Sequence, residues 1–145
     1  MILEYNYLNI IMIKIFHISD IHIRNGDKKA SRYEEYSTVF DNLFISLKTN
    51  IEKYKLDKTE YLIIVSGDIF HNKNVIGNFG LELYNKFIKG LTDIGITIIF
   101  HGNHDRNQNE IDQPSLISST IEMNNLTILK ETQSFIIDDI GFTYV

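Results

Sequence analysis

Three strongly apolar runs alternate with two segments of helical periodicity, and this order limits the fold more than any other feature of the chain. The runs cover residues 13–19, 61–68 and 96–103, and the helical segments cover 31–54 and 80–94. Continuous apolar runs are typical of strands that are buried on both faces. The pattern therefore predicts an α/β fold built on a βαβαβ unit, with a parallel sheet and right-handed crossovers.

Smaller elements are predicted in the rest of the chain. A short helix is expected over 115–123, followed by apolar runs at 126–129, 134–138 and 141–145. The turn sequence DDIG between the last two runs predicts a terminal hairpin. In the second helical segment one face gathers Leu81, Tyr84, Phe87, Ile88 and Leu91. Gly95 then lies where a glycine commonly ends a helix.

Composition sets the class of protein. The 145 residues are 43% hydrophobic and 23% charged, which fits one domain with one core. We interpret residues 1–11 as an extension and 12–145 as the domain. The net charge of −5 means that any polyanion must be held locally. The lack of cysteine excludes disulfides and thiolate sites and suits an intracellular location in the cytoplasm, nucleoid or nucleus. No apolar stretch approaches the roughly 18 residues of a membrane span, so no membrane partner is expected.

Polar side chains gather where the three apolar runs end. The runs lead into SDIH (19–22), SGDIFH (66–71) and HGNHD (101–105). Parallel strands bring their carboxyl ends to one edge of the sheet, where ligands bind. Gly67 and Gly102 remove a Cβ where the chain must turn sharply and approach a ligand. The sequence thus predicts one site at this edge.

The residue types at this edge suit divalent cations. Asp20 and His22 are two positions apart, which in extended backbone sends both side chains to one side. A carboxylate and an imidazole together suit manganese, iron or zinc. Asp68 can bridge two cations, and Asn103 offers an amide oxygen. A two-metal centre can acidify a water and clamp the oxygens of a displacement at phosphorus, with His104 left to protonate the leaving oxygen.

The motifs FHISDIHIR, VSGDIFH and GNHD resemble the first three blocks of the calcineurin-like metallophosphoesterases: D-x-H, G-D, and G-N-H-D or G-N-H-E. The form GDIFH, together with His17, is most similar to the SbcD-type DNA repair exonuclease subunits. The resemblance implies a β-sandwich flanked by helices. This chain would hold its N-terminal βαβαβ half and a hairpin, truncated at the C-terminus.

The resemblance also implies roles and partners. The implied metal ligands are Asp20, His22, Asp68 and Asn103. His104 would be the acid or phosphate-orienting group, and His71 would act on the scissile phosphate. The implied cofactors are two divalent ions, Mn²⁺ first, with iron or zinc as alternatives. The implied partners are a DNA substrate and an SbcC-like coiled-coil ATPase.

One departure from the family pattern keeps several functions open. The family completes its metal shells with a further histidine and a late G-H-x-H block, whereas no histidine follows His104. The gene can be truncated or split, a partner can supply the ligands, or activity can be lost. The first hypothesis is a metal-dependent phosphodiester hydrolase, a DNA exonuclease or endonuclease of repair. The alternatives are a phosphatase or cyclic-nucleotide phosphodiesterase, or an inactive remnant that binds a partner.

Structural roles are expected for the other polar residues near these motifs. His17 and His101 are interpreted as supporting histidines, and Asp105 as orienting its neighbours. The aromatic stripe Tyr36, Phe40 and Phe44 is expected to pack in the core. The basic residues of the first loop are Arg24, Lys28, Lys29 and Arg32. A solvated loop is the favoured reading of this cluster, with phosphate binding as the alternative. The unpaired edge of half a fold also predicts self-association.

Overall fold

Four parallel strands, hydrogen-bonded to one another in chain order, form the main sheet of this computed structural model. The structure describes residues 13–24, 30–72, 77–102, 123–129, 133–137 and 140–144. The strands are β1 (Lys14–Ile18), β2 (Tyr61–Ser66), β3 (Thr97–Phe100) and β4 (Leu126–Leu129). Helices α1 (Ala30–Tyr54) and α2 (Asn78–Ile94) follow β1 and β2. The predicted βαβαβ unit is confirmed, and β4 extends it beside β3.

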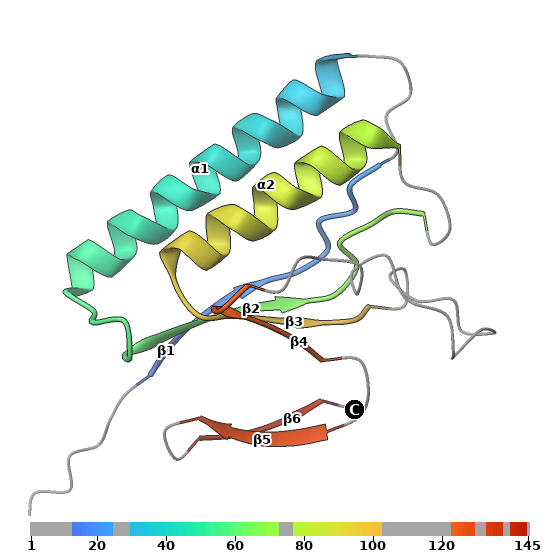
Figure 1. Ribbon diagram of the computed structural model, residues 1–145. Coiled ribbons are helices and arrows are strands. Elements are labelled where there is room, and N and C mark those ends of the chain that lie inside the picture. The colour runs from blue at the N-terminus through green and yellow to red at the C-terminus, as the bar shows by residue number, and fades with distance from the viewer. Residues whose placement is uncertain are drawn as a thin grey trace, which may run out of the picture.

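Both helices cover the same face of the sheet (Figure 1). Right-handed crossovers that add each strand in one direction place successive helices on one side. Beneath the helices Ile63, Val65 and Ile99 are fully buried. Phe40 of α1 and Phe87 of α2 pack with ring centroids 4.9 Å apart. The main core therefore lies between the helices and the sheet.

A hairpin covers part of the opposite face of the sheet (Figure 1). Its strands are β5 (Gln133–Ile137) and β6 (Ile140–Tyr144), which pair antiparallel as predicted. Phe142 of β6 packs against a cluster that contains Leu62, Ile64, Ile98 and Leu129. At β1 this face is more open, and Ile15 is 44% exposed. The fold is thus a mixed α/β layer with the start of a second β layer, which is consistent with a partial metallophosphoesterase sandwich.

The buried face of α2 differs from the prediction at one position. Tyr84, Phe87, Ile88 and Leu91 are buried as expected, together with Leu83. Leu81, by contrast, is 48% exposed. Its neighbour Gly80 is buried against the core, and successive helical residues are about 100° apart around the axis. Leu81 therefore lies at the margin of the buried face.

Gly95 ends α2, but for a different reason from the expected one. Its φ of −169° is extended and not left-handed. A Cβ at this position would lie 2.5 Å from the ring of Tyr61. The Tyr61 hydroxyl passes this point to donate a 2.6 Å hydrogen bond to the Ile94 carbonyl. Burial raises the pKa of Tyr61, so the hydroxyl remains a donor at neutral pH.

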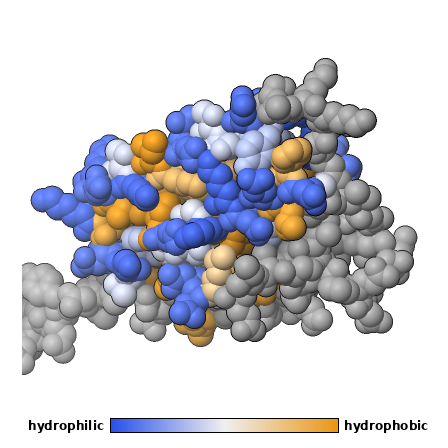
Figure 2. Space-filling model, turned by 45° about the horizontal axis from the view of Figure 1, so that its top comes forward, coloured by the Kyte–Doolittle hydropathy of each residue, from blue (hydrophilic) through white to orange (hydrophobic). Residues whose placement is uncertain are grey.

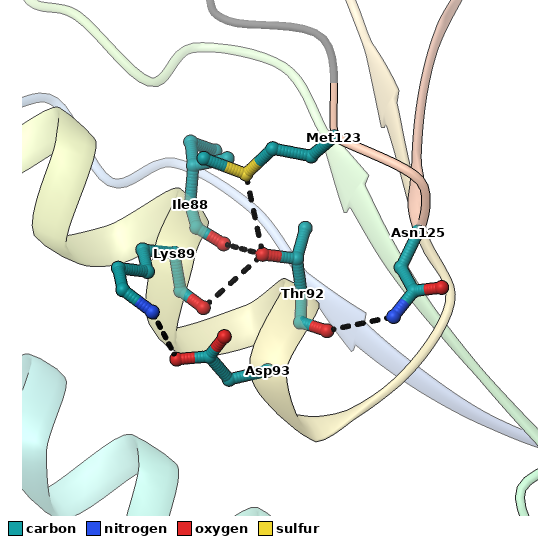
Figure 3. A network of polar contacts seen from close by, with 6 residues as sticks. All are labelled: Ile88, Lys89, Thr92, Asp93, Met123 and Asn125. Atoms are coloured by element: carbon teal, nitrogen blue, oxygen red, sulfur yellow. Dashed lines mark hydrogen bonds and ion pairs between the residues drawn. The ribbon is translucent and has the colours of Figure 1, made fainter.

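The last turn of α2 holds the segment that enters β4 (Figure 3). The Asn125 amide donates to the Thr92 carbonyl at 3.1 Å, while the Thr92 hydroxyl donates to the Ile88 carbonyl at 3.0 Å. The Thr97 N–H in turn donates to the Asn125 carbonyl at 2.8 Å. Asn125 thereby joins α2, β3 and β4 and sets where the fourth strand begins.

Two expectations fall on parts of the chain that the structure does not describe. These are the extension over residues 1–11 and most of the short helix over 115–123. Within the described ranges, no helix has the length and apolar character needed to cross a membrane. On the side that the helices cover, hydrophilic residues are interleaved with apolar ones (Figure 2).

Replacing Phe87 tests the core. Phe87→Ala should lower the free energy of unfolding by about 3–5 kcal/mol, because a fully buried ring is removed. Phe79→Ala removes the same atoms from a ring that is 60% exposed. Its cost should stay below about 1 kcal/mol. Urea unfolding followed by circular dichroism measures both, and equal losses would contradict this core.

Candidate metal centre

The loops that follow β1 and β2 run side by side beyond the ends of the strands. The His22 N–H donates to the Asp68 carbonyl at 2.9 Å. The Ile23 N–H donates to the Ile69 carbonyl at 2.7 Å, and the Ile23 carbonyl accepts from the His71 N–H at 3.0 Å. These bonds continue the parallel pairing of the two strands. They hold the first sequence motif against the second.

Three of the predicted ligands converge in this region. One donor atom from each of Asp20, His22 and Asp68 lies within 4.8 Å of the others. We call these three residues the donor group. The His22 Nε2 lies 3.9 Å from the Asp20 Oδ1. Donors bound to one ion at about 2.1 Å are at most about 4.2 Å apart, so the group fits a divalent cation after a small closure.

The backbone of the donor group is left-handed, which corrects one expectation. The φ angles are 56° at Asp20, 48° at His22 and 53° at Asp68. Asp20 and His22 therefore converge through a turn and not through extended backbone. The turn lets the His22 N–H reach the Asp68 carbonyl. Each such residue costs about 1–3 kcal/mol, and strain of this kind is concentrated at functional sites.

Two glycines allow the loops after β2 and β3 to touch. Gly67 has a φ of 72°, and a Cβ there would lie 2.3 Å from the Gly102 Cα. A Cβ at Gly102 would lie 2.2 Å from both the backbone N and the Oδ1 of Asp68. Both positions need glycine, because the two loops approach each other. The predicted approach to a ligand stays a prediction. The third sequence motif thus begins in direct contact with Asp68.

The remaining predicted site residues fall into two groups. The His71 ring lies edge-on to the His22 ring, with centroids 5.7 Å apart, so His71 neighbours the donor group. Asn103 and His104 lie outside the described residues, as does Asp105, and their roles stay predictions.

The histidines that we interpreted as supporting residues have different surroundings. His17 of β1 shares a hydrogen bond between its Nε2 and the Ser66 hydroxyl of β2. His101 is buried directly after β3.

Tyr36 of α1 is a residue of the site that sequence reasoning missed. Its hydroxyl donates a 2.7 Å hydrogen bond to the His22 carbonyl. The helical spacing of Tyr36 indicated only core packing, and its ring does pack against Phe40, with ring centroids 6.1 Å apart. The helix therefore braces the loop that carries Asp20 and His22.

The sheet with helices on one face and the donor group at its carboxyl edge define a metallophosphoesterase domain. A profile of the calcineurin-like phosphoesterase family matches residues 13–142. The chain belongs to this family, whose members use divalent metal ions. It is also 34% identical over 122 residues to an uncharacterized protein of Acanthamoeba polyphaga mimivirus. That match covers 81% of this chain but 8% of the relative, so the chain spans a small part of that protein.

The contact between the glycines gives a direct test. Gly102→Ala and Gly67→Ala should each lower the free energy of unfolding by at least about 2 kcal/mol, because the added Cβ meets backbone atoms. Gly141→Ala in β6 is the control, since its Cβ would meet nothing within 4 Å. This control should change stability by less than about 0.5 kcal/mol. Urea titration would refute the close approach if all three variants unfolded alike.

Proposed function

We propose that this chain is the metal-binding part of a phosphodiester hydrolase that acts on DNA, related to the SbcD-type repair nucleases. The observation that carries the proposal is the convergence of Asp20, His22 and Asp68 at the carboxyl edge of a parallel sheet. Membership of the calcineurin-like phosphoesterase family supports the reaction class. The motif GDIFH, which contains His71, supports the nuclease branch.

In this proposal Asp20 and His22 hold one ion, Asp68 bridges two, and Asn103 binds the second. Manganese is the proposed metal, since it accepts both carboxylate and imidazole ligands. When bound, two such ions supply an acidified water and a positive clamp for the phosphoryl oxygens. Two divalent ions carry four positive charges, whereas Asp20 and Asp68 supply two negative charges. The surplus favours a bound phosphate.

Histidines orient the substrate in this scheme. The backbone N–H of His71 donates to the Ile23 carbonyl, and this bond fixes the His71 backbone beside the donor group. From there its imidazole can hydrogen-bond the scissile phosphate. His104 is proposed to protonate the leaving oxygen.

A coiled-coil ATPase of the SbcC type is the proposed partner, because the motif GDIFH resembles that of the SbcD-type subunits. A second candidate is a domain whose remaining metal ligands come from elsewhere in a larger assembly.

Self-association is also proposed. Within the described sheet β1 pairs only with β2, and an open strand edge can pair with another chain. Sedimentation velocity should show a dimer or larger species, and a monomer at all concentrations would contradict this part.

Asp68→Asn tests the proposal with little change in shape. The substitution removes the bridging charge and should lower Mn²⁺ affinity at least about tenfold and abolish cleavage of bis(p-nitrophenyl) phosphate. Asp93→Asn is the matched control, because Asp93 lies on α2 in an exposed pair with Lys89. Calorimetric Mn²⁺ titration and hydrolysis of the chromogenic diester measure the two effects.

Three outcomes separate the alternatives. Equal Mn²⁺ affinity in wild type and Asp68→Asn would refute the metal centre. Cleavage of DNA but not of p-nitrophenyl phosphate selects a nuclease over a phosphatase. Mn²⁺ binding without any hydrolysis selects the second candidate.

A further inference from the structure

A hollow of about 280 Å³ adjoins the donor group. Its lining residues are His22, Arg24, Arg32, Glu35, Tyr36 and Val39. We call it the arginine hollow. Because His22 belongs both to this lining and to the donor group, a ligand in the hollow would lie directly beside the metal centre.

The walls of the arginine hollow come from two elements that are fixed to each other. Positions 32, 35, 36 and 39 follow helical spacing and form one face of α1. His22 and Arg24, from the loop after β1, form the other wall. The Tyr36 hydroxyl joins the two walls through the His22 carbonyl. Ile23, between the two loop residues, is buried and bonded to Ile69. The hollow is therefore preformed.

The charge of the hollow favours an anion. Among the residues that the structure describes, neither Arg24 nor Arg32 takes part in an ion pair. Among the described residues of the lining, Glu35 supplies one carboxylate and the two arginines supply two guanidinium groups, which leaves one positive charge in excess. This excess lies on a chain whose net charge is −5. A planar guanidinium binds phosphate through two parallel hydrogen bonds.

The hollow also has an apolar side. Val39 is 55% exposed although it lies in the lining, and the Tyr36 ring lies beside it along the same helix face. An exposed apolar side chain next to the guanidinium groups of Arg24 and Arg32 suits a phosphate that carries an organic group. Inorganic phosphate alone would leave the apolar side uncovered.

We propose that the arginine hollow binds a second phosphate of the substrate, the neighbour of the scissile phosphate in a polynucleotide. This inference rests on the proposed hydrolase function and specifies its substrate. It replaces the interpretation of Arg24 and Arg32 as part of a solvated loop. The hollow then selects substrates with consecutive phosphodiesters over those with one isolated phosphate.

Binding in the absence of metal isolates this subsite. The probe is fluorescein-labelled hexathymidylate, followed by fluorescence anisotropy with the full chain in EDTA. The double variant Arg24→Gln with Arg32→Gln should bind about tenfold more weakly. The slope of log affinity against log salt should become shallower by about 0.7, because one phosphate contact on a single strand is lost.

Lys48→Gln is the control for the loss of a positive charge elsewhere on α1. Lys48 is an exposed residue of α1, about 24 Å along the helix from Arg32. It should change affinity by less than about twofold. The double variant Arg24→Lys with Arg32→Lys keeps both charges but lacks the planar guanidinium groups. It should give an intermediate loss of affinity for hexathymidylate. Circular dichroism confirms that each variant is folded.

The outcomes distinguish this inference from the proposed function. No measurable binding by the wild type, or an equal loss in Lys48→Gln and the double glutamine variant, overturns the subsite. In a third outcome, the wild type takes up no Mn²⁺ and only the arginine variants lose hexathymidylate binding. The hydrolase proposal then fails and the phosphate subsite stands. With Mn²⁺ present, the glutamine variants should lose DNA cleavage more than cleavage of bis(p-nitrophenyl) phosphate, which has no second phosphate.

Discussion

The site depends on the contact between the loops that follow β2 and β3. Gly67 and Gly102 approach so closely that a Cβ on either would lie 2.3 Å or less from backbone atoms of the other loop. This contact places Asp68 against the start of the third motif. The Asp68 carbonyl also accepts the His22 N–H, which brings the first motif to the same point. One residue thus links three strand ends.

The rigid layers around these loops make the strained geometry possible. Three left-handed residues would be unstable in a free loop, because each costs about 1–3 kcal/mol. Here the loops continue from strands whose inner residues, such as Ile63, Val65 and Ile99, are fully buried beneath two helices. The α1 helix adds a direct hydrogen bond from Tyr36 to the His22 carbonyl. The same bond closes the arginine hollow, so one helix supports both the donor group and the proposed phosphate subsite.

Sequence patterns predicted the local structure well and the long-range geometry less well. The run 126–129 and the two main helices have nearly the predicted bounds, because apolar periodicity reports directly on which residues are buried. The left-handed turn at Asp20 and His22 was not predicted, since it depends on a bond to Asp68, far along the chain. The placement of β4 beside β3 depends in the same way on Asn125. The arginine hollow depends on a tertiary contact between the loop after β1 and one face of α1. The spacing of residues in the sequence does not predict such a contact.

The central claim is that Asp20, His22 and Asp68 form a divalent metal centre. The most direct test is anomalous diffraction from crystals of the chain grown with Mn²⁺. We expect a manganese peak within about 2.5 Å of the donor atoms of all three residues. A peak elsewhere, or none while the three side chains keep the described arrangement, would contradict the account.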